Sequence, residues 1–126
     1  MKRPNFIIGE PEPGQALSVR KLVIETAKFN VITAHSTAEM LESAKRFPAV
    51  DAIIIHSALD GSLPNVIEQV REVLPQKPVV ALSPSAVQVP EADYTVSSHD
   101  PNELVELLRK LFGDPRAIDQ ELANAG

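Results

Sequence analysis

The sequence predicts an α/β domain built around a parallel sheet of five strands, with helices covering both of its faces. Strand-like and helix-like segments alternate over most of the 126 residues, which is the element order of chains that form parallel sheets. The first, third and fourth strand segments are almost wholly apolar, as strands are when both faces of a sheet are covered. The length fits one domain with its own core. We expect that domain over residues 1–113, with residues 114–126 as a tail or linker.

Three strands and two helices are predicted in the first half of the chain. Apolar residues recur at helical spacing from Gln15 to Phe29 and indicate the first helix. Ser36 and Glu39 have the spacing of a capping box and open a second helix, which Pro48 ends. The strands are short apolar or β-branched runs at residues 6–8, 30–34 and 52–55.

The second half predicts two further strands and two further helices. A third helix begins near Pro64, a favoured first-turn residue, and ends at Pro75. The last helix is capped by Asp100, carries Glu103 in its first turn and closes at Gly113. The remaining strands are residues 79–82 and 94–96.

Right-handed crossovers between these strands give a doubly wound, flavodoxin-like sheet of order 2-1-3-4-5. In such sheets the functional groups gather at the carboxyl ends of the strands. The residues at those ends are Gly9-Glu10, His56-Ser57, Ser83-Pro84 and Ser97-Ser98.

Composition excludes several classes of function. Cysteine is absent, which removes disulfide scaffolds, thiolate metal sites and cysteine catalysis. The net charge is -5 and the basic doublets Arg20-Lys21 and Arg109-Lys110 fall on predicted helices, where a solvated face explains them, so we expect no nucleic-acid binding. No apolar run is long enough for a signal peptide or a membrane span, and we expect a cytoplasmic protein.

Four segments in order carry a resemblance to the receiver domains of two-component response regulators, over about residues 5 to 112. They cover the turn after the first strand, the third strand with its loop, the fourth strand, and the fifth strand with the start of the last helix. The segments read FIIGEPEP at 6–13, DAIIIHSALDG at 51–61, VVALSP at 79–84 and ADYTVSSHDPNEL at 92–104.

The resemblance implies a phosphorylation site that this chain lacks. Receivers hold Mg²⁺ with an acidic pair, attack phosphorus with an aspartate, and use a Ser or Thr and a lysine to hold the phosphoryl oxygens. The lysine is normally followed by a proline, where this chain has Ser98. The residues here at the five site positions are, in that order, Glu10 and Pro11, His56, Ser83 and Ser97.

Two other family features are altered. Ser83 and Tyr94 resemble the switch pair of receivers, but without a phosphoryl group we expect Tyr94 only to half-pack at the sheet edge. The connection at residues 84–93 is too short and proline-rich for a full helix, so the family's fourth helix is shortened or absent. That loss predicts an exposed sheet edge with Val87 and Val89 as apolar contacts.

The resemblance therefore implies a degenerate receiver, or pseudo-receiver, that acts by phosphorylation-independent protein–protein interaction. We expect no enzymatic activity, no cofactor and no metal. The expected partner is a signalling kinase or an output domain, and a homodimer is a candidate. The expected contact elements are the last helix, the connection at 84–93 and the tail.

Three alternatives remain open at this stage. The chain could be an atypical receiver phosphorylated at His56 or Asp60. Glu10, His56 and His99 could together bind a transition metal. A small-ligand module using the strand ends is the third alternative. Against all of these, we expect His56 to fill the vacated pocket and to form a hydrogen bond with Glu10 or Ser83.

Overall fold

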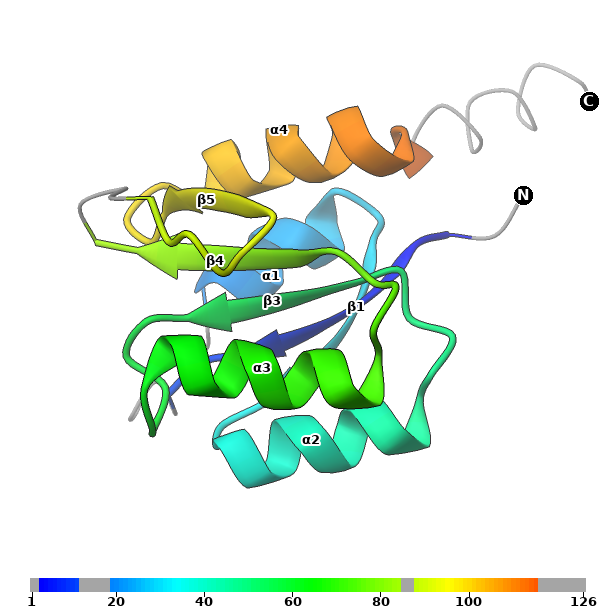
Figure 1. The fold of residues 1–126 in the computed structure, drawn as a ribbon. Helices are drawn as coiled ribbons and strands as arrows, with labels where there is room; N and C mark the ends of the chain where they lie inside the picture. Colours follow the sequence, from blue (N-terminus) through cyan, green and yellow to red (C-terminus); the bar gives the residue numbers. More distant parts are fainter. Residues whose placement is uncertain (1–2, 12–18, 85–87, 116–126) are drawn as a thin grey trace, which may run out of the picture.

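A parallel sheet of five strands forms the centre of the molecule, with two helices on each of its faces (Figure 1). The computed structural model describes residues 3–11, 19–84 and 88–115. The strands are β1 (Asn5–Gly9), β2 (Asn30–Ala34), β3 (Ala52–His56), β4 (Val79–Ser83) and β5 (Tyr94–Ser97). The helices are α1 (Val19–Thr26), α2 (Thr37–Arg46), α3 (Leu63–Val73) and α4 (Pro101–Phe112). The strand order is β2-β1-β3-β4-β5, as predicted.

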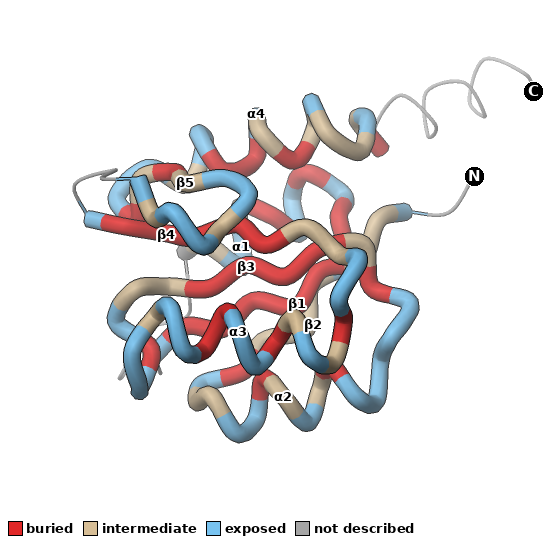
Figure 2. Tube along the Cα trace, viewed as in Figure 1, coloured by how far each residue is buried: buried red, intermediate tan, exposed pale blue. Residues whose placement is uncertain are grey.

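Alternating side chains of the buried strands build one core on each face of the sheet. Ile8 and Ile54 pack in a cluster with residues of α1 and α4, whereas Ile7 and Ile53 pack in a second cluster with residues of α2 and α3. Every residue of β4 is buried, and Figure 2 shows the inner strands as the buried centre of the molecule. The two apolar clusters hold four amphipathic helices against the sheet and so fix where the strands end.

The predicted caps at the N-termini of α2 and α4 are confirmed. Ser36 Oγ accepts a hydrogen bond from Glu39 N, and the Glu39 carboxylate accepts one from His35 N at 2.8 Å. The Asp100 carboxylate accepts hydrogen bonds from the first-turn amides of Asn102 and Glu103. These acceptors satisfy amides that have no partner inside their helices.

Helix α1 is shorter than the pattern from Gln15 to Phe29 predicts. Residues 15–18 lie outside the described part of the chain, and the helix ends at Thr26. Lys28 has a φ of 72°, a left-handed conformation that ends helices. The tail predicted at 114–126 lies outside the described residues beyond Pro115.

The connection between β4 and β5 contains no helix in its described part, residues 84 and 88–93. The prediction that Val89 is an exposed contact is wrong, because Val89 is partly buried and packs against the cluster on the α2 and α3 side. Val87 lies outside the described residues. Arg71 of α3 fastens the connection by donating to Glu91 O at 2.8 Å and pairing with the Asp93 carboxylate at 3.2 Å. Arg71 therefore holds the described part of this connection to α3.

None of the helices in the described part of the chain combines the length and the apolar character needed to cross a bilayer.

Candidate functional site

The carboxyl ends of the strands bring most of the predicted site residues to one edge of the sheet. Glu10 directly follows β1, His56 ends β3, Ser83 ends β4 and Ser97 ends β5. The register pairs Ser83 with Ser97, and pairs Leu82, the residue before Ser83, with His56. A parallel sheet thus gathers side chains from four separate segments, as such folds do at their ligand sites.

Glu10 is buried at this edge and forms an ion pair with Arg20 of α1. The side chains are 4% and 14% exposed, and a guanidinium Nη1 group donates to the carboxylate. The second Nη group of Arg20 donates to the carbonyl oxygen of Ser98 at 2.7 Å. Arg20 therefore joins the end of β1 to the segment after β5, across the positions of β3 and β4. The buried carboxylate of Glu10 therefore has a positive charge beside it at the end of β1.

Gly9 allows the chain to approach α2 and the β3–α3 loop closely just before Glu10. A Cβ atom on Gly9 would lie 2.6 Å from Met40 Sδ and 3.0 Å from Leu59 Cδ2. Both distances are shorter than ordinary van der Waals contact, so a larger residue would have to displace buried side chains. The absence of a side chain at Gly9 therefore lets the backbone just before Glu10 lie close to Met40 and Leu59.

His56 forms a different hydrogen bond from the one predicted. Its Nδ1 atom accepts from Ala58 N at 2.9 Å, and neither Glu10 nor Ser83 is its hydrogen-bond partner. Glu10 is engaged by Arg20 instead, and the short loop after β3 brings its own amide to the ring. Burial lowers the pKa of His56 from its ordinary 6.5, Arg20 and His99 act in the same direction, and Glu10 opposes them.

The hydroxyl residues lie near this cluster, and Tyr94 lies at the far end of β5. Ser83 and Ser98 are buried, and Ser98 N donates to Ser83 O at 3.0 Å. Ser97 Oγ accepts from His99 N at 3.1 Å.

Tyr94 pairs with Val80 in the register, so it starts β5 about 10 Å along the strands from Ser83. The residue is 38% exposed, in keeping with the half-packed position predicted for it.

Asp60 has a structural role in the loop after β3. Its carboxylate accepts from Thr37 N at 2.7 Å, and Thr37 Oγ1 donates to Asp60 O. This places the acid at the N-terminus of α2, where negative charge is favourable. Gly61, at a φ of 90°, turns the chain immediately afterwards.

The residues at the strand ends do not fit a magnesium ion. Mg²⁺ prefers several oxygen ligands in octahedral geometry. Glu10 is the one carboxylate at these positions, its charge is matched by Arg20, and Pro11 has no side-chain oxygen. Within residues 3–11, 19–84 and 88–115, no three His, Cys, Asp or Glu side chains are arranged to hold a metal, so Glu10, His56 and His99 form no such group.

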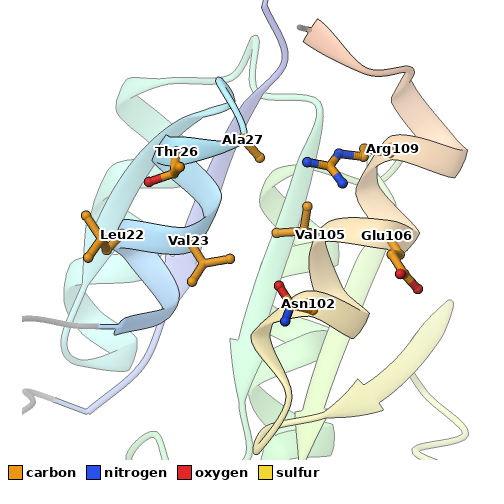
Figure 3. A pocket seen from close by; sticks show the side chains of 8 residues that line it. All are labelled: Leu22, Val23, Thr26, Ala27, Asn102, Val105, Glu106 and Arg109. Carbon is orange, nitrogen blue, oxygen red and sulfur yellow. The ribbon is translucent and has the colours of Figure 1, made fainter.

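A separate groove of about 530 Å³ lies between α1 and α4, away from the strand ends. Figure 3 shows Val23 and Val105 approaching each other from the two helices, with the Arg109 guanidinium directed from α4 toward α1. Leu22 stands on this face and is 59% exposed. The groove is lined by Leu22, Val23, Thr26, Ala27, Asn102, Val105, Glu106 and Arg109.

Sequence reasoning missed Arg20, which it assigned to a solvated helix face. The available signal was the absence of a basic residue at Ser97, where the resemblance places a lysine, together with a glutamate at the end of the buried strand β1. A buried carboxylate requires a cation, and Arg20 lies near enough in sequence, in the helix that follows β1.

Comparison of the structure with solved structures shows receiver folds. A response-regulator receiver domain protein from Clostridium thermocellum superposes with a TM-score of 0.74 at 15% identity, covering 91% of this chain and 98% of that one. A sensor protein from Polaromonas sp. JS666 gives 0.73 at 23% identity, covering 86% of this chain and 95% of that one. The receiver domain of a sensor histidine kinase from Pseudomonas aeruginosa PAO1, solved with magnesium in its active-site cleft, gives 0.72 at 18%, with 86% and 97% covered.

No protein-family model matches the sequence, and no curated protein matches it in a sequence search. The structural similarities establish the fold, and the predicted receiver-like architecture is confirmed at that level.

Proposed function

We propose, with the receiver fold as the premise, that this chain is a signalling module whose phosphorylation site has been replaced by an internal ion pair. Such a module acts by binding other proteins and does not depend on phosphorylation, and it is not itself an enzyme. We further propose that it works in the cytoplasm beside a signalling kinase or an output domain.

The observation that carries this proposal is the contact between Arg20 and Glu10 beside His56. The imidazole stands at the end of the central strand β3, where the resemblance expects an attacking carboxylate. The guanidinium of Arg20 donates hydrogen bonds both to the buried carboxylate of Glu10 and to the carbonyl oxygen of Ser98. Phosphoryl transfer to an aspartate needs a metal and a carboxylate nucleophile together, and these side chains supply neither.

The experiment is exposure of the purified chain to acetyl phosphate and Mg²⁺, followed by intact-mass measurement and peptide mapping under conditions that preserve acid-labile phosphates. We expect no phosphorylated species, in the unaltered chain or in Asp60→Asn. An active receiver from another protein serves as the positive control. Phosphate mapped to His56 or Asp60 would refute the proposal and favour an atypical receiver.

Small-ligand binding at the strand ends is the alternative from a different class. Thermal-shift measurements with nucleotides and divalent metals separate the two readings, because a ligand that binds only the folded state raises the melting temperature. We expect nucleotides and metals to raise the melting temperature no more than the buffer ions do. A saturable rise in the melting temperature that is lost in Arg20→Met would support the ligand module instead.

As the partner of the face formed by α1 and α4, we propose a second copy of this chain. Leu22 is 59% exposed beside the apolar groove, so a twofold arrangement can insert each Leu22 into the groove of the other copy. Glu106 and Arg109 line the same groove with opposite charges, which allows them to pair across such an axis.

Light scattering coupled to size-exclusion chromatography tests this proposal. We expect a dimer for the unaltered chain and a monomer for Leu22→Glu, whereas Phe47→Glu, at another exposed apolar residue (42% exposed), leaves the dimer intact. A monomer at all concentrations for the unaltered chain would overturn it.

A further inference from the structure

The hydrogen bond between Ala58 N and His56 Nδ1 fixes the protonation state of the ring. A backbone amide can only donate, so Nδ1 must present its lone pair across the 2.9 Å contact. The ring proton of neutral His56 is therefore on Nε2. A proton on Nδ1 and this hydrogen bond exclude each other.

The surroundings of His56 oppose its positive form. The charged and titratable groups that act on it are Arg20 from α1, Glu10 after β1 and His99 after β5. Glu10 is the one acid among them, and its charge is already matched by Arg20. Burial and the two basic neighbours together lower the pKa of His56 from its ordinary value.

The loop that begins at His56 is held by the buried side chain of Leu59, which packs in the cluster on the α2 and α3 side, and by a few hydrogen bonds. Leu59 N donates to His56 O at 3.1 Å, and Ser57 N donates to Leu82 O at 2.9 Å. Further along, the Asp60 carboxylate holds the first amide of α2, that of Thr37. The ring of His56 thus anchors one end of the β3–α3 loop, residues 57–62, and Asp60 anchors the other to α2.

We propose that His56 is a proton-operated latch for the β3–α3 loop. Neutral His56 holds Ala58 and keeps the loop closed over the end of β3. When Nδ1 takes a proton from solvent, the bond to Ala58 N–H is lost and an imidazolium stands beside Arg20. The turn at Ala58 then loses its contact with the end of β3 while Leu59 stays packed in the core, and the change reaches α2 through Asp60 and Thr37. This device operates whether or not the chain binds a signalling partner.

NMR titration of the uniformly ¹⁵N-labelled chain over about pH 5 to 8 tests the latch. At the upper end we expect the ring of His56 to show an unprotonated Nδ1 and a protonated Nε2. On acidification the Ala58 amide shifts and loses protection from hydrogen exchange, with the same midpoint as His56, and the Thr37 amide follows. The Asn102 amide, held by Asp100, serves as an internal reference that does not follow that midpoint.

Two variants separate the latch from general acid sensitivity. In His56→Asn the side-chain oxygen takes the place of Nδ1 as an acceptor that does not titrate, so Ala58 stays protected throughout. In His56→Leu no acceptor remains, so Ala58 is exchange-labile at every pH. If the leucine variant does not fold, the titration of the unaltered chain and of the asparagine variant still tests whether the Ala58 amide follows His56.

The proposal is overturned if the chemical shift and exchange protection of the Ala58 amide do not change as His56 titrates. A proton on Nδ1 of the neutral ring, or an asparagine variant that keeps the pH dependence of the original chain, overturns it as well.

Discussion

Replacing Arg20 with methionine should expose the energetic cost of the buried carboxylate at the strand ends. Methionine retains an unbranched stem and a similar helix propensity, so the change removes mainly the charge and its hydrogen bonds. Glu10 is 3% exposed as a whole residue and its side chain 4%, so water cannot replace the lost guanidinium. The carbonyl of Ser98 loses a donor at the same time.

Removing one partner of a buried ion pair costs about 3–5 kcal/mol. Because Arg20 retains 14% exposure, we take the lower end, a loss of about 3 kcal/mol in the free energy of unfolding. With a denaturant slope of about 1.5 kcal/mol per molar urea, the midpoint falls by about 2 M. This is a large part of the total stability of about 5–15 kcal/mol that is typical of such domains.

The assay is urea unfolding followed by circular dichroism, with two comparison variants. The double variant Glu10→Gln with Arg20→Met should regain most of the loss, because no uncompensated charge remains. Arg46→Met breaks the pair with Glu42, whose side chains are 68% and 69% exposed, and should cost no more than about 0.5 kcal/mol. Equal, small losses of stability for Arg20→Met and Arg46→Met would show that the buried ion pair contributes no more than an exposed one.

Three further predictions follow from particular contacts. Gly9→Ala should lower stability by about 1–3 kcal/mol, since its Cβ would lie 2.6 Å from Met40 Sδ. In a Met40→Ala background, which is itself less stable, the same change should lower the melting temperature less. An unchanged melting temperature for Gly9→Ala alone would contradict the packing. Asp100→Ala should lower the free energy of unfolding by about 1 kcal/mol because α4 loses its cap, whereas Asp100→Ser should lower it less. Equal urea midpoints for the two variants would contradict a capping role for Asp100. Because the pKa of His56 is lowered on folding, the unfolded chain takes up its proton at a higher pH than the folded chain. The free energy of unfolding is then highest above pH 6.5 and decreases as the pH falls through the folded pKa; His56→Asn should flatten that part of the profile, and an identical slope in both chains would count against it.

Most of the fold could be predicted because local and periodic signals agree with one another. The apolar runs of the inner strands, the Ser36 and Asp100 caps and the helix-ending prolines each restrict the chain within a few residues. The absence of a helix in the described part of the connection before β5 followed from the length and proline content of that segment. The position of Val89 could not be predicted this way, because whether a loop residue faces the core depends on how Arg71 fastens the loop to α3.

The candidate site was predictable as a set of strand ends and not as a set of contacts. Parallel topology brings Glu10, His56, Ser83 and Ser97 to one edge, whatever their side chains do there. Arg20 reaches that edge from a helix, and its direction depends on tertiary packing that no short pattern reports. The contact of His56 with Ala58, by contrast, spans two residues and is of the local side-chain-to-backbone kind that turn chemistry could have suggested.

In the proposed site a guanidinium, and no divalent metal, neutralises the carboxylate of Glu10 at the strand ends. Titration of the ¹⁵N-labelled chain with Mn²⁺, a paramagnetic substitute for Mg²⁺, distinguishes the two through line broadening of nearby amides. We expect the amides of Glu10, His56 and Ser83 to broaden no more than exposed amides elsewhere. Selective, saturable broadening at those three amides, reversed by excess Mg²⁺, would contradict it.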